Sequence, residues 1–119
     1  MNVDDLAKLI DAKVICRGEE CEIKEFCCTD LMSDVLAYTH EGECTALITA
    51  LSNAQALRTA EMVDIKTVII VRGKAIEKKL VDIAADNEIT LLSTELSMFD
   101  VAGKIKETLD LQKEKAKNA

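Results

Sequence analysis

The residues best suited to bind a ligand follow the apolar segments that we predict to be strands. The carboxyl ends of parallel strands meet at one edge of a sheet, and ligands bind in the crevice outside that edge. Ser52, Asn53 and Thr94 are expected at helix N-termini, whose backbone amides attract anions. Arg72 and Lys74 would add positive charge to an otherwise acidic chain. The predicted ligand-binding residues are Asp30, Ser52, Asn53, Arg72, Gly73, Lys74 and Thr94.

The same residues also have an ordinary structural explanation. Asn2, Ser52 or Asn53, and Thr94 stand directly before helical segments, where such residues commonly cap the first turn. An Arg-Gly-Lys sequence is a common turn between a strand and a helix. The loops therefore fit either an anion site or a set of caps and turns.

Residues for covalent chemistry are few. His40 is the only histidine, and its place in a predicted turn favours an exposed loop residue over a catalytic triad. The five cysteines match no zinc or iron–sulfur spacing, so we expect reduced thiols. The four glycines are too widely spaced for a phosphate-binding loop or a dinucleotide fingerprint. A small enzyme using carboxylates such as Asp30 and Asp34 has the least support. We therefore expect no catalytic residues, no metal and no cofactor.

Alternating apolar segments predict the elements that must position these residues. We expect strands at residues 13–16, 23–28, 46–49, 67–71 and 89–92. Apolar side chains at helical spacing predict helices around residues 6–10, 31–38, 57–63, 76–84 and 98–105. Residues 19–36 are expected to add an edge or antiparallel strand. Single helices join the last three strands, which is typical of parallel sheets. The predicted fold class is α/β, a single three-layer domain with a mostly parallel sheet of about five strands flanked by helices.

Length and charge limit the classes of function. The chain has 119 residues and a net charge of −7, which disfavours binding to nucleic acid and to acidic membranes. No apolar run approaches the roughly twenty residues of a membrane span, and the first residues lack a secretory signal, so we expect a cytoplasmic protein. Residues 112–119 carry a net charge of +2 and are expected to form a frayed basic tail after a domain at residues 1–111.

Several segments resemble the stand-alone DRTGG-domain proteins of anaerobic bacteria. They are CTDLMSDVLA (28–37), ALITALSN (46–53), ALRTAEM (56–62) and VIIVRGK (68–74), followed by LLST (91–94) and SMF (97–99). The resemblance implies a fold similar to the N-terminal domain of HPr kinase. Such domains also occur in regulated pyrophosphatases carrying CBS domains and near the catalytic parts of phosphotransacetylases. None of these hosts does its chemistry in this domain.

The sequence departs from the motif of that family at two loops. Leu51-Ser52-Asn53 stands where many members have Gly-Asp-Arg. Val71-Arg72-Gly73 stands where they have Thr-Gly-Gly, so one motif glycine remains. Glycine lets a backbone approach a ligand closely, and these loops offer fewer such positions.

The resemblance and the lack of a reactive constellation together predict a noncatalytic regulatory or interaction module of an anaerobic bacterial metabolic or signalling system. We expect it to form a homodimer and to serve a larger enzyme or signalling protein. The alternative function is a small-molecule sensor that binds an anionic ligand or a nucleotide at the carboxyl edge of the sheet.

Overall fold

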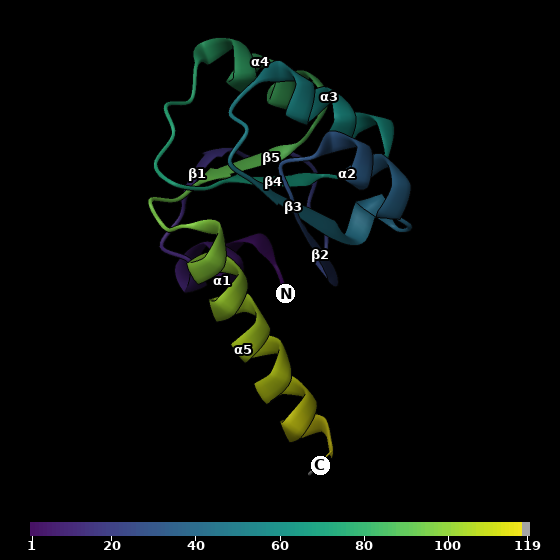
Figure 1. Ribbon diagram of the computed structural model, residues 1–119, viewed down its shortest axis with the longest axis vertical. Helices are drawn as coiled ribbons and strands as arrows, with labels where there is room; N and C mark the ends of the chain where they lie inside the picture. Colours follow the sequence, from purple (N-terminus) through teal and green to yellow (C-terminus); the bar gives the residue numbers. More distant parts are fainter. Residues whose placement is uncertain (118–119) are drawn as a thin grey trace.

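Five strands form one sheet at the centre of the computed structural model, which describes residues 1–117 (Figure 1). The strands are β1 (Lys13–Cys16), β2 (Glu25–Cys28), β3 (Thr45–Thr49), β4 (Thr67–Ile70) and β5 (Thr90–Ser93). Their order across the sheet is β1-β5-β4-β3-β2. β2 to β5 run parallel, and β1 pairs antiparallel with β5. The predicted five-stranded, mostly parallel sheet is therefore confirmed.

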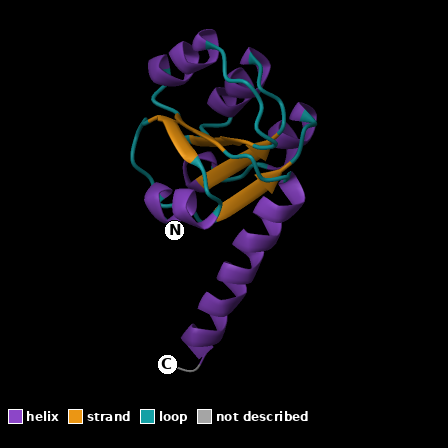
Figure 2. Cartoon of the chain, turned by 90° about the vertical axis from the view of Figure 1, so that its left-hand side faces the viewer, coloured by secondary structure: helices purple, strands orange, loops and turns teal. Residues whose placement is uncertain are grey.

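Helices cover both faces of the sheet, as expected for three layers (Figures 1 and 2). The α-helices are α1 (Val3–Leu9), α2 (Met32–Tyr38), α3 (Ala54–Met62), α4 (Lys78–Asp86) and α5 (Met98–Lys117), and η1 (Gly42–Cys44) is a short 3-10 helix. Apolar residues of α2, α3 and α4 pack on one face of the sheet, while those of α1 and α5 pack on the other.

The central strands are mostly apolar because they are buried on both faces, with threonines at their ends. Neighbouring residues of a strand point to opposite faces. In β3, Leu47 joins the core beneath α2 to α4, while Ala46 and Ile48 join the core beneath α1 and α5. All five residues of β3 and all four of β4 are buried. These continuous apolar segments explain why the strands were predicted correctly.

The segment whose topology was ambiguous forms the edge strand β2. It pairs with β3 in parallel, so the expected edge strand is confirmed and an antiparallel arrangement of this segment is wrong. α2 carries the chain back across the sheet before β3 begins, as a parallel connection requires. The antiparallel strand is β1 instead, at the other edge.

The last helix is longer than the sequence suggested. α5 continues through Lys117, so helix extends into the part expected to form a frayed tail from residue 112, and residues 118–119 lie outside the described part. Lys, Glu, Gln and Ala are good helix formers, and Lys106 forms an ion pair with Asp110 at 3.1 Å. The last turns of α5 are exposed and project from the body (Figure 2). Within residues 1–117, no helix combines the length and the apolar character needed to cross a membrane.

Candidate ligand-binding edge

The seven predicted ligand-binding residues all follow the carboxyl ends of parallel strands. Asp30 follows β2, Ser52 and Asn53 follow β3, the segment 72–74 follows β4, and Thr94 follows β5. Because β2 to β5 are parallel and adjacent, these loops emerge at one edge of the sheet. The following contacts decide which of these residues remain available for a ligand.

Asp30 joins the ends of two neighbouring strands. Its Oδ1 atom accepts a hydrogen bond from the Thr49 hydroxyl at 2.9 Å and another from the Ala50 amide at 2.7 Å. The Thr49 hydroxyl also accepts from the Leu51 amide at 3.2 Å. Hydrogen bonds to a charged acceptor are stronger than neutral ones. Asp30 therefore holds the loop after β2 against the loop after β3.

The turn after β4 is held to the loop after β5 through its backbone. Arg72 and Gly73 both have left-handed backbone conformations, with φ of 69° and 61°. Their amides donate to the carbonyls of Leu96 at 2.8 Å and Thr94 at 2.9 Å. These amides are therefore already paired and do not form an anion-binding nest.

A carboxylate that the sequence reasoning missed lies beside this turn. A Cβ atom added to Gly73 would lie 2.8 Å from Oε2 of Glu95. The negative charge of Glu95 opposes an anion at that point, although the exposed side chains of Arg72 and Lys74 supply positive charge nearby. Among the residues that the structure describes, neither Arg72 nor Lys74 forms an ion pair. These two cations are the part of the predicted site that remains open to a ligand.

Thr94 does not cap a helix, so that expectation is wrong. Its side chain is only 2% exposed, and its hydroxyl donates to the Ile10 carbonyl at 2.7 Å. The same hydroxyl accepts from the Leu96 amide at 3.2 Å. α5 begins at Met98, and the oxygen that accepts from its first turn is Ser97 Oγ, 3.1 Å from the Asp100 amide. Thr94 therefore connects the end of β5 to α1.

The predicted cap before α3 is Asn53 rather than Ser52. Asn53 Oδ1 accepts from the Ala56 amide at 3.1 Å, and Asn2 Oδ1 likewise accepts from Asp5 at the start of α1. Ser52 is half-buried beside the cap. Capping satisfies one of the amides that the first turn leaves unpaired. Of the expected caps, Asn2 and Asn53 have this role, and Asn53 is the only one of them at the carboxyl edge, where its side chain is already engaged.

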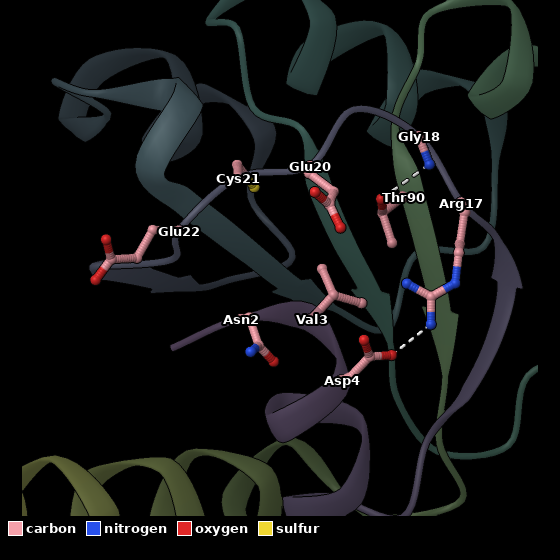
Figure 3. A pocket seen from close by; sticks show the side chains of 9 residues that line it. All are labelled: Asn2, Val3, Asp4, Arg17, Gly18, Glu20, Cys21, Glu22 and Thr90. Atoms are coloured by element: carbon pink, nitrogen blue, oxygen red, sulfur yellow. Dashed lines mark hydrogen bonds and ion pairs between the residues drawn. The ribbon is translucent and has the colours of Figure 1, made fainter.

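A cavity that the sequence did not predict lies at the end of the sheet where the parallel strands begin (Figure 3). It has a volume of about 500 Å³ and lies where Thr90 begins β5. The Gly18 amide donates to Thr90 Oγ1 at 3.0 Å, and Figure 3 shows the Arg17 side chain directed at Asp4, with which it forms an ion pair. Its lining includes three carboxylates and one guanidinium, a balance that disfavours anions. The carboxylates are Asp4, Glu20 and Glu22.

The surroundings of the two thiols of β2 favour their neutral form. Burial raises the pKa of Cys27, and the negative charge of Asp34 raises it further. Burial also raises the pKa of Cys28, with Cys27 adding to the effect. Thiols are nucleophilic as thiolates, so both groups react slowly near neutral pH. His40 is exposed in the loop between α2 and η1. Within residues 1–117, no cluster of three His, Cys, Asp or Glu side chains could hold a metal ion.

Most of this chain matches a known protein family. The family model described as the DRTGG domain matches residues 5–108. The fold is similar to the crystal structure of the CBS and DRTGG domains of the regulatory region of Clostridium perfringens pyrophosphatase, complexed with the activator diadenosine tetraphosphate. The TM-score is 0.72 at 16% identity, over 87% of this chain and 45% of that chain, so this chain spans less than half of it. No curated protein matches.

Proposed function

Since this chain belongs to the DRTGG-domain family, we propose that it is a noncatalytic regulatory or interaction module that acts as a homodimer in an anaerobic bacterial metabolic or signalling system. The observation that carries the proposal is that most polar side chains at the carboxyl edge are hydrogen-bonded within the chain itself. Asp30 and Thr94 bind other parts of the same chain, and Asn53 caps α3. These side chains stabilise the loops. We therefore propose that the chain acts by contact with other protein chains.

The matched regulatory region supports the same proposal. That region belongs to a pyrophosphatase and contains a DRTGG domain of similar fold. We infer that this chain likewise serves a larger enzyme or signalling protein, in the cytoplasm, and does so through protein contact.

The homodimer is tested by thermal unfolding at several protein concentrations. A dimer that unfolds to separate chains gains stability by mass action, so its midpoint temperature rises with concentration. We expect a clear rise between about 1 and 100 μM, a range typical of specific protein interfaces. A midpoint that stays constant over this range would contradict the homodimer.

A second candidate function is the sensing of an anionic ligand at the carboxyl edge. The exposed Arg72 and Lys74 favour it, since both follow β4 and neither forms an ion pair within residues 1–117. The matched regulatory region was complexed with diadenosine tetraphosphate, a polyanionic nucleotide. For this chain we propose the same chemical class of ligand, contacted by Arg72 and Lys74 at the loops that Asp30, Asn53 and Thr94 hold in place.

Thermal shift distinguishes the two functions. Diadenosine tetraphosphate, adenosine nucleotides and acetyl phosphate are the probes. A ligand at 100 times its dissociation constant stabilises the folded state by about 2.7 kcal/mol. The Arg72→Ala/Lys74→Ala variant should lose any shift that the native chain shows. Lys78→Ala, an exposed lysine in α4, is the matched control and should keep it. Native and control chains that do not shift with any probe would contradict the sensor.

A further inference from the structure

The two edges of the sheet differ in how they are protected. Edge strands carry unpaired backbone groups, and proteins usually block them with bulges, prolines or charges. At the β1 edge, the register with β5 shifts between Val14 and Cys16, an irregularity of the kind that discourages further pairing. β2 pairs with β3 without a shift in register, and the chain contains no proline. Within residues 1–117, no strand pairs with the outer edge of β2.

An apolar groove lies directly beside this open edge. It has a volume of about 610 Å³ and is bounded by β2 and α5. Three residues of β2, Glu25, Phe26 and Cys28, line it together with Lys24 just before the strand, and Phe26 is only partly buried against the core. The apolar lining residues are Phe26, Ile48, Ala102, Ile105 and Leu109.

The charges around the groove indicate what kind of partner fits. Lys24, Glu25 and Lys106 lie at the groove, so both signs of charge are present, although the whole chain has a net charge of −7. A partner surface whose charges all had one sign would be repelled by like charges on part of the rim of this groove. An identical rim turned by a two-fold axis, as in isologous dimers, can avoid placing like charges directly opposite each other.

We propose that β2 pairs with β2 of a second copy of this chain, antiparallel, about a two-fold axis at Phe26. This inference rests on the homodimer of the proposed function and specifies its interface. The two sheets become one continuous sheet, and the backbone groups at both open edges are paired. Residues directly opposite in an antiparallel pair share a face, so the two phenylalanines lie together and the two apolar grooves join.

This register also avoids repulsion between the strands. Glu25 stands opposite the partner subunit's Cys27, and Lys24 stands opposite the partner subunit's Cys28. No two like charges are directly opposite within the strands, an arrangement that favours pairing. Lys24 also approaches the end of the partner strand, which the partner subunit's Asp30 follows. The side chains on both sides of the axis are therefore compatible with the backbone pairing.

Disulfide trapping tests the interface. Directly opposite residues in antiparallel strands have Cα atoms about 4.5–5.5 Å apart, within the range that a disulfide spans. Mild oxidation of Phe26→Cys should therefore link most of the protein into covalent dimers. The native chain, oxidised in the same way, shows how much covalent dimer forms through its own cysteines, and this amount is the background. Phe99→Cys is the matched control, since Phe99 is 84% exposed on α5, and it should remain at that background.

Sedimentation of charge variants tests the same axis without oxidation. Phe26→Lys places two positive charges opposite each other and should raise the dimer dissociation constant at least tenfold, while Phe99→Lys leaves it unchanged. Circular dichroism of each variant verifies folding. A native chain that sediments as one chain at about 100 μM overturns the homodimer and this interface together. A native dimer with no linkage of Phe26→Cys above background overturns the interface alone.

Discussion

Replacing Asp30 by alanine should destabilise the fold by about 2 kcal/mol, because two hydrogen bonds to one charged oxygen are lost. The Thr49 hydroxyl, 2.9 Å from Asp30 Oδ1, belongs to a side chain with 0% exposure, so water cannot easily replace the acceptor. The Ala50 amide, 2.7 Å from the same oxygen, lies closer to solvent and should lose less. Asp30→Asn keeps an acceptor oxygen and should cost about half as much.

Urea unfolding followed by circular dichroism measures this difference. All variants are compared at one protein concentration, because a dimer's stability depends on concentration. Glu107→Ala is the matched control: Glu107 is an exposed carboxylate on α5, and surface changes of this kind stay within about 0.5 kcal/mol. If Asp30→Ala is as stable as Glu107→Ala, Asp30 does not join the two loops, and its carboxylate returns to the set of groups available for a ligand.

Three further predictions follow from buried contacts. Thr94→Val should lower the free energy of unfolding by about 1–2 kcal/mol in urea, with Thr94→Ser close to native. Gly18→Ala should destabilise by about 3 kcal/mol or prevent folding, since the added Cβ would lie 2.1 Å from the Glu88 carbonyl oxygen. Raised pKa values of Cys27 and Cys28 keep these thiols protonated in the folded chain above about pH 8.5, where unfolded cysteine ionises. The free energy of unfolding should therefore fall as pH rises past that value, and less so in the Cys27→Ser/Cys28→Ser variant.

The strands could be predicted from local patterns because the sheet is covered on both faces. β3 and β4 are buried throughout, and a short apolar run between polar turns is typical of such a strand. Parallel order followed from the single helices between β3, β4 and β5. These features depend on neighbours in the sequence, which is why the fold class was predictable.

The roles of individual polar residues depended on distant contacts. Thr94 and Ser97 both precede α5 and both are suitable caps, so local rules could not choose between them. Burial of Thr94 and its bond to the Ile10 carbonyl, 84 residues away, settles the choice. Similarly, no local signal connects Asp30 to Thr49. The sequence indicated a turn at Gly18. No local signal showed that this turn lies beside Thr90, 72 residues away, where the unexpected cavity forms.

The sequence prediction of the last helix, α5, was too short for a different reason. A lysine-rich chain end resembles a solvated tail, yet its residues are also good helix formers. Intrinsic propensity and the ion pair of Lys106 with Asp110 support a helix that leaves the body of the protein. Composition alone could not separate an exposed helix from an exposed coil.

The central claim is that this chain acts by protein contact, beginning with a second copy of itself. Multi-angle light scattering of the native chain, eluted at about 50 μM, tests this claim most directly. We expect a mass of twice 13.1 kDa. A mass of 13.1 kDa across the elution peak would contradict it.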